Sequence, residues 1–313
     1  MLIKQITEIF DLLDRPDTSG QLVLDYIKQK GAEEVSVRRM EQEGHGTDFI
    51  RIVIPGSHGK IRGGTAPTLG VIGRLGGLGA RPEMTGFVSD GDGALAALAA
   101  AAKVLDMNSH NEYLRGDLYI CTHICPDAPT MPHKPVPFMG SPVDMQVMNK
   151  MEVYDEMDAI ISIDTTRGNR IINHKGIALS PTVKEGYILR ISEDLLNIMQ
   201  ITTGENPYTF AITTQDITPY GNGLYHLNSI LQPSTATRAP VVGVAITAET
   251  VVPGCATGAS NGMDAEMAAR FTVEVAKSFG EGGCSFYDEA EYLLLQEKYG
   301  SMSCIQTMGT RGR

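Results

Sequence analysis

Two hydrophobic patterns alternate along the chain. Apolar residues recur at helical spacing in some segments, as at Ile6, Ile9 and Leu13, which is typical of a helix with one buried face. Elsewhere, short runs of consecutive apolar residues are bounded by Gly, Pro or Asp, which is typical of buried strands. The predicted helices are 3–14, 20–30, 91–105, 143–151, 192–202, 263–279 and 287–298, and the predicted strands are 33–40, 49–54, 66–72, 117–122, 159–163, 208–213 and 240–246.

The order of these elements indicates the fold class. Strands alternate with helices, and most of the strands are apolar at every position. Because such strands are buried on both faces, we expect an α/β fold with a mostly parallel sheet that helices cover on both sides. No internal repeat or linker interrupts the chain, so we expect a single domain over 1–313 with a helical tail from about residue 280.

A glycine-rich turn with two carboxylates, Asp90 and Asp92, precedes the predicted helix at 91–105. This helix is rich in Ala and Leu, which lose little entropy on becoming helical, and its small side chains allow close packing against a sheet. Asp92 is placed to be the N-cap, where its oxygen would accept a hydrogen bond from the first turn.

Polar side chains follow several of the predicted strands. His123 comes after the strand at 117–122, Asp164 comes after the strand at 159–163, and Cys255 lies in a small-residue loop after a third. Because sites in open α/β sheets lie outside the carboxyl ends of the strands, we expect these side chains and Asp90 at one edge of the sheet.

Charge and composition exclude some function classes. The formal net charge is −11 and no Lys/Arg cluster is present, so we expect no nucleic-acid partner. No apolar run reaches about 18 residues and the first residues lack a signal-peptide core, so we expect neither membrane association nor secretion. The five scattered cysteines indicate reduced thiols in the cytoplasm. A homo-oligomer is the usual state of soluble enzymes of this size.

The order of several segments resembles the zinc-dependent aminopeptidases that carry a two-metal site. Residues 12–27 resemble the opening helix–Pro-x-x-Ser-Gly–helix of that superfamily. Residues 89–92 with the Ala/Leu-rich helix resemble its metal-bridging Asp, and residues 162–165 resemble its later metal-binding Asp. The resemblance covers most of the chain and implies the α/β fold of that superfamily. The whole sequence is also similar to a bacterial family of uncharacterised proteins. This similarity does not indicate which activity the chain has.

The chain departs from the aminopeptidase pattern at three places. Arg74 stands near the position of the first metal-binding His. Residues 122–127 replace the adjacent Glu pair that provides the general base and a ligand, and Cys255 lies where the last His is expected. The inserted second domain of some members is missing, since about fifteen residues separate Arg74 from Asp90. A standard two-zinc site is therefore not intact.

The remaining donors would suffice for one metal ion. Zinc binds imidazole nitrogen, carboxylate oxygen and thiolate sulfur, and a catalytic site keeps one position open for water. The candidate ligands of a divalent metal, expected to be zinc, are Asp90, His123, Asp164 and Cys255, with Asp127 as the alternative to Cys255. Such a metal would lower the pKa of its bound water and polarise a carbonyl group.

The predicted function is a divergent metal-dependent hydrolase of amide or peptide bonds in a small substrate. Asp127 is the first candidate for the carboxylate that takes the proton of the water, and Asp92 is the second. Arg74 is the candidate for binding a substrate carboxylate with two hydrogen bonds, which would favour a small acidic peptide or amide.

Two alternatives stay open. Cys125 beside His123 would form a thiolate–imidazole nucleophile, provided that the strand continues past them, which Pro126 opposes. The chain is otherwise a non-catalytic small-molecule-binding or scaffold protein on a decayed aminopeptidase fold, and Arg74 in place of a ligand favours this alternative. In that case His123 is a hydrogen-bonded core residue, Asp164 and Asp127 are turn residues, and Cys255 is an inert buried thiol.

Overall fold

A computed structural model gives the structure of the chain. It describes residues 1–74, 86–126, 128–132, 134, 137–166, 168–212, 224–225, 227–255 and 259–307. Its centre is a mixed sheet in the strand order β1-β2-β4-β3-β7-β12-β8-β11, and β9 and β10 join it beside β12. The strands are β1 (Glu34–Gln42), β2 (His45–Ile54), β3 (Leu69–Gly73), β4 (Leu118–Ile124), β7 (Ala159–Thr166), β8 (Gly176–Leu179), β9 (Val183–Lys184), β10 (Tyr187–Ile188), β11 (Tyr208–Thr209) and β12 (Val241–Thr247).

The four central strands, β4, β3, β7 and β12, are parallel to one another. Their residues are almost all buried, as expected of strands that are covered on both faces. At the edge beyond β4 the pairing is antiparallel, between β2 and β4 and between β1 and β2. β1 and β2 form a hairpin whose turn places Glu43 and Gly44 at positive φ. The predicted α/β class is confirmed.

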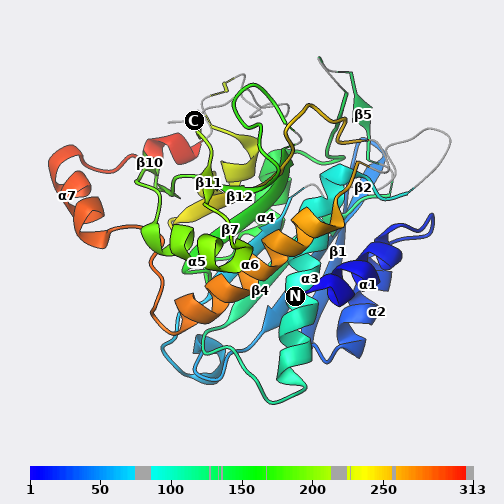
Figure 1. Cartoon of the computed structure of the whole chain (residues 1–313), viewed down its shortest axis with the longest axis horizontal. Coiled ribbons are helices and arrows are strands. Elements are labelled where there is room, and N and C mark those ends of the chain that lie inside the picture. The colour runs from blue at the N-terminus through cyan, green and yellow to red at the C-terminus, as the bar shows by residue number, and fades with distance from the viewer. Residues whose placement is uncertain are drawn as a thin grey trace.

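Most of the helices cover one face of the sheet (Figure 1). α3 lies between α1 and α6 on this face and is buried along nearly its whole length. Its start approaches the strands closely, since a Cβ on Gly73 would lie 2.6 Å from the Gly93 carbonyl oxygen. The helices are α1 (Ile3–Leu13), α2 (Gly20–Gln29), α3 (Asp92–Asn108), α4 (Met145–Glu152), α5 (Glu193–Thr203), α6 (Gly262–Gly280) and α7 (Glu289–Tyr299).

The opposite face is covered by α4 and by the 3-10 segment η3 (Ser229–Thr235). A second apolar cluster lies there, formed by side chains such as Ile72, Cys121 and Ile160 with Ile230 and Leu231 of η3. Because side chains alternate along a strand, the residues two positions beyond Ile72 and Cys121, namely Arg74 and His123, belong to this same face.

The predicted helices agree with the observed ones to within a few residues, but the strands differ in several places. No strand was predicted where β8, β9 and β10 lie. The strand predicted at 208–213 is only Tyr208–Thr209 in the described residues. Two short strands, β5 (Thr130–Met131) and β6 (Phe138–Met139), lie in the proline-rich segment. His123 and Asp164 lie within β4 and β7, because pairing with Phe49 and Ala245 continues to these positions.

Asp92 is not the N-cap of α3, so that prediction is wrong. A 3-10 turn, η2 (Ser89–Gly91), leads directly into the helix, and Asp92 already has helical φ and ψ of −60° and −29°. Its carboxylate instead accepts a hydrogen bond from Ser260. Among the helices of the described ranges, none is long and apolar enough to span a membrane.

Candidate functional site

The parallel strands bring several of the predicted site residues to one edge of the sheet. Arg74 directly follows β3, and its backbone N–H donates to the Ile163 carbonyl at 2.7 Å, next to Asp164 in β7. The turn that carries Asp90 joins the same edge, because Thr165 Oγ1 donates to the Ser89 carbonyl at 2.8 Å. These contacts are consistent with the expectation that Asp90 and Asp164 lie at the carboxyl edge of the sheet.

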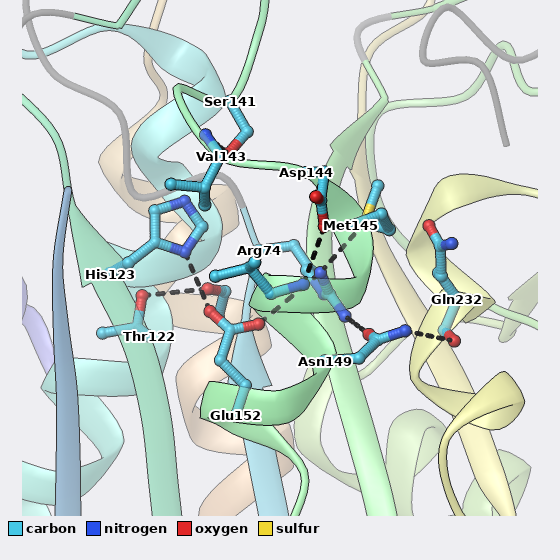
Figure 2. Close-up of polar contacts among 12 residues, drawn as sticks. Arg74, Thr122, His123, Ser141, Val143, Asp144, Met145, Asn149, Glu152 and Gln232 are labelled. Atoms are coloured by element: carbon cyan, nitrogen blue, oxygen red, sulfur yellow. Dashed lines mark hydrogen bonds and ion pairs between the residues drawn. The ribbon is translucent and has the colours of Figure 1, made fainter. Parts of the chain in front are cut away.

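A buried carboxylate that was not predicted, Glu152, joins Arg74 to His123 (Figure 2). The His123 Nδ1 atom lies 2.8 Å from Glu152 Oε1, and Arg74 Nη1 lies 3.5 Å from Glu152 Oε2. All three side chains are buried: His123 is 1% exposed, Glu152 is 0% exposed and Arg74 is 2% exposed. Removing charges from water is costly, so such a group is stable only when its charges balance, as the guanidinium and carboxylate do here.

Helix α4 positions this carboxylate. Met145, Asn149 and Glu152 lie at i, i+4 and i+7, which places them on one face of the helix. Arg74 Nη2 donates to Asn149 Oδ1 at 2.6 Å, and Nη1 lies 3.4 Å from Met145 Sδ. Asp144 caps the helix by accepting from Val147 N–H at 2.9 Å. The signal in the sequence was an acid that lies directly after the predicted helix 143–151, at helical spacing from Met145 and Asn149.

The hydrogen bond to Glu152 determines how His123 is oriented. A carboxylate only accepts hydrogen bonds, so the proton of this bond lies on Nδ1, and in a neutral imidazole Nε2 is then the acceptor. The Phe49 ring lies beside the imidazole, with 5.3 Å between the ring centroids. A carboxylate on one ring nitrogen is the arrangement that orients His both as a general base and as a metal ligand.

Asp90 and Cys255 lie together at a different part of the same edge. Gly254 lies against the Asp90 carboxylate, since a Cβ there would be 1.9 Å from Asp90 Oδ1. The Gly254 carbonyl accepts from Asp90 N–H at 3.0 Å and from Ser89 Oγ at 3.0 Å. Burial, with a smaller effect of the Asp90 charge, raises the pKa of the Cys255 thiol, which favours the neutral thiol over the thiolate that binds metals.

The remaining predicted residues have other contacts or are not described. Asp164 Oδ1 accepts from the Thr165 backbone N–H at 2.7 Å, and Asp92 Oδ1 accepts from Ser260 Oγ. The Cys125 thiol donates to the Gly46 carbonyl at 3.4 Å. Asp127, the first candidate for the general base, lies outside the described residues.

Among the residues that the structure describes, no three His, Cys, Asp or Glu side chains are placed to hold a metal ion together. Glu152 and Nδ1 of His123 bind each other, and the Arg74 guanidinium adds a positive charge beside them. A cation placed at the Glu152 carboxylate would be repelled by this guanidinium.

The fold resembles that of aminopeptidases. The LapA aminopeptidase of Legionella pneumophila aligns with a TM-score of 0.51 and 12% identity, over 92% of this chain and 71% of that chain. An M17 aminopeptidase from Trypanosoma brucei aligns with a TM-score of 0.49 and 11% identity, over 87% of this chain. The chain spans 62% of the length of the trypanosomal protein. The architecture is therefore an aminopeptidase-like α/β fold.

The family of the chain is established by a different comparison. A family model described as a protein of unknown function, DUF1177, matches residues 38–309. The chain belongs to this family. A search of curated proteins finds no match to this chain.

Proposed function

We propose that this chain hydrolyses amide or peptide bonds in a small substrate at the carboxyl edge of its sheet, with His123 as the group that moves the proton. The observation that carries the proposal is the buried hydrogen bond of 2.8 Å between Glu152 and His123 Nδ1. The likeness to aminopeptidases supports the reaction class only through the fold.

The chemistry follows from the orientation of the imidazole. With Nδ1–H bound to Glu152, Nε2 is free of that bond and can take a proton from an attacking water. The carboxylate stabilises the imidazolium that then forms, as the Asp of a Ser-His-Asp triad does. Arg74 balances the charge of Glu152 and, with Asn149, holds α4 against the strand. Arg74 is in this proposal a positioning residue.

The test is hydrolysis of a panel of small peptides and amides by the wild type and by His123→Gln. We expect the variant to lose at least about 100-fold in rate, the usual effect of removing a general base. His110→Gln is the matched control, because His110 is exposed just after the end of α3. This variant should hydrolyse the panel as fast as the wild type. Equal rates in His123→Gln and the wild type would refute the proposal.

A divalent metal at Asp90, His123, Asp164 and Cys255, expected to be zinc, is a separate proposal. Elemental analysis of protein that was purified without chelators, beside Asp164→Ala, tests it. Near-stoichiometric metal that is lost in the variant would support the metal site and would make Asp127 or Asp92 the candidate base. If the protein takes up neither zinc nor manganese, the proposed metal site is contradicted. The proposed role of His123 in proton transfer is not affected by that result.

A second candidate function, non-catalytic binding of a small molecule, is favoured by the place of Arg74. Its guanidinium stands where the aminopeptidase resemblance expects a metal ligand, and it binds Glu152 and Asn149. This candidate predicts stabilisation by small molecules in a thermal-shift screen, no response to metals, and no turnover. Hydrolysis that His123→Gln abolishes would rule it out.

A further inference from the structure

Gln232 places a carboxamide inside the protein, in the 3-10 segment η3. The residue is 0% exposed, and within the described ranges neither its Oε1 nor its Nε2 atom has a hydrogen-bond partner. Buried polar groups are nearly always paired, and a buried group that is left unpaired destabilises the fold. A methionine has about the same length and lacks these groups, so packing does not explain a glutamine at this position.

The backbone of Gln232 is joined to the network of the proposed site. Its carbonyl accepts from Asn149 Nδ2 at 3.5 Å and from Thr235 Oγ1 at 2.8 Å. The same Asn149 accepts from Arg74 Nη2 at 2.6 Å. Figure 2 shows the amide end of Gln232 extending away from Asn149. The position of Gln232 is therefore fixed beside Arg74, while its amide takes no part in that network.

Two buried hydroxyl groups face the same layer. Ser162 Oγ in β7 and Thr247 Oγ1 in β12 are also without a hydrogen-bond partner among the described residues, and both side chains are 0% exposed. Ser162 lies two positions after Ile160, and Thr247 lies two positions after Ala245. Ile160 and Ala245 belong to the apolar cluster that η3 covers, so the two hydroxyls are on this face of the sheet. Unpaired donors and acceptors on one face can be satisfied by a polar ligand.

We infer that Gln232 recognises one inner residue of an extended peptide. Its Nε2 would donate to the carbonyl of that residue, and its Oε1 would accept from the N–H of the same residue. In an extended chain these two groups point to the same side, so a single carboxamide can contact both. The inference rests on the proposed function, and it narrows the substrate class from small amides to peptides whose inner residue lies between two peptide groups.

The test is calorimetric titration of the His123→Gln protein, in which binding is measured apart from hydrolysis. The ligands are tetra-alanine and three analogues, each with one peptide N–H replaced by an ester oxygen. We expect one analogue to bind at least about tenfold more weakly than tetra-alanine, because the buried Oε1 is then left without a donor. Adding Gln232→Met should remove this difference. A side chain with a purely structural role would change the binding of all four ligands alike.

Gln200→Met is the matched control, because Gln200 is exposed on α5. It should keep the difference between tetra-alanine and the weakest analogue. Urea unfolding gives a second readout. Gln232→Met should unfold at the same urea concentration as the wild type or at a higher one, because it removes unpaired polar atoms from the interior.

The inference is overturned if tetra-alanine does not bind, if all three analogues bind as tightly as tetra-alanine, or if Gln232→Met keeps the difference. Failure of the proposed function is a separate result. In that case the wild type hydrolyses none of the peptides, while the preference that depends on Gln232 is still measured by calorimetry.

Discussion

Glu152 Oε1 lies 2.8 Å from His123 Nδ1, although the two residues come from different layers of the molecule. His123 is in the parallel strand β4, and Glu152 is the last residue of α4, which packs on the sheet face opposite α3. The orientation of the candidate proton-transfer group therefore depends on the docking of α4. Arg74 at the end of β3 completes the contact by pairing with the second carboxylate oxygen.

Glu152→Gln should destabilise the protein by about 3–5 kcal/mol. The variant leaves the guanidinium of Arg74 buried without a carboxylate, and removing one partner of a buried ion pair has an effect of this size. Urea unfolding measures the change. Glu156→Gln, at an exposed position, is the control and should change stability by no more than about 0.5 kcal/mol.

The double variant Arg74→Met with Glu152→Gln should recover part of this loss, because neither charge is then buried. A double variant that is as unstable as the sum of the two single changes would show that the pair is not coupled. Stability of Glu152→Gln equal to that of the wild type would contradict the buried network itself.

Gly254→Ala should displace Asp90 and destabilise the chain by about 1–3 kcal/mol. The added Cβ would lie 1.9 Å from Asp90 Oδ1, and the Gly254 carbonyl is held by hydrogen bonds from Asp90 N–H and Ser89 Oγ. Thermal unfolding measures the effect. Gly262→Ala is the control, since the nearest atom to its Cβ, on Ile6, would be at an ordinary 3.6 Å. Equal losses in the two variants would refute the close contact.

Stability should fall as the pH drops below about 4.5, in part through a surface network between α1, α2 and α3. The hydrogen bond from Tyr26, with Lys30, lowers the pKa of Glu8 below its ordinary 4.5. Burial opposes a shift at Asp106, but hydrogen bonds from Gln5 and Lys30 lower its pKa below 3.8. Since both pKa values are lower in the folded state, the unfolded chain binds more protons, and this stabilisation is present above those ordinary values and lost as pH falls.

The dependence of the melting temperature on pH checks this prediction. Glu8→Gln and Asp106→Asn should each show a shallower decline on the acid side than the wild type. Asp155→Asn, at an exposed position with no such network, should decline as steeply as the wild type. An unchanged acid decline in both network variants would count against the prediction.

The native protein should react with iodoacetamide at neutral pH mainly at Cys304, which is half-buried. Burial raises the pKa of Cys121 well above its ordinary value and that of Cys284 to about 12. Burial and Asp90 also raise the pKa of Cys255, so few of these thiols are ionised. Mass spectrometry of the labelled protein, before and after denaturation, measures the difference.

The same labelling tests the thiolate–imidazole alternative. Cys125 is 1% exposed, and its thiol donates to the Gly46 carbonyl, so we expect it to stay unlabelled in the native protein. Rapid labelling of Cys125 that His123→Gln slows would instead support a nucleophilic cysteine.

The periodicity of the chain was sufficient to predict the helices and the central strands of the sheet. α1, α2, α4, α5, α6 and α7 begin and end within a few residues of the predicted positions, because helical spacing of apolar residues depends only on near neighbours in the chain. The continuously apolar strands predicted the buried parallel centre, because strands that are covered on both faces carry apolar residues at every position. They also led to the prediction that Asp90, His123, Asp164 and Cys255 lie at one edge of the sheet, since parallel strands end together.

Only the tertiary structure decided which polar side chains contact one another at that edge. The helix spacing of Met145, Asn149 and Glu152 is visible in the sequence, but it does not show that this face packs over Arg74 and His123. Asp92 was expected to cap its own helix, and it contacts Ser260, which is 168 residues away. Such contacts depend on how the layers dock, and docking is set by packing between segments that are distant in the chain, which a local pattern does not encode.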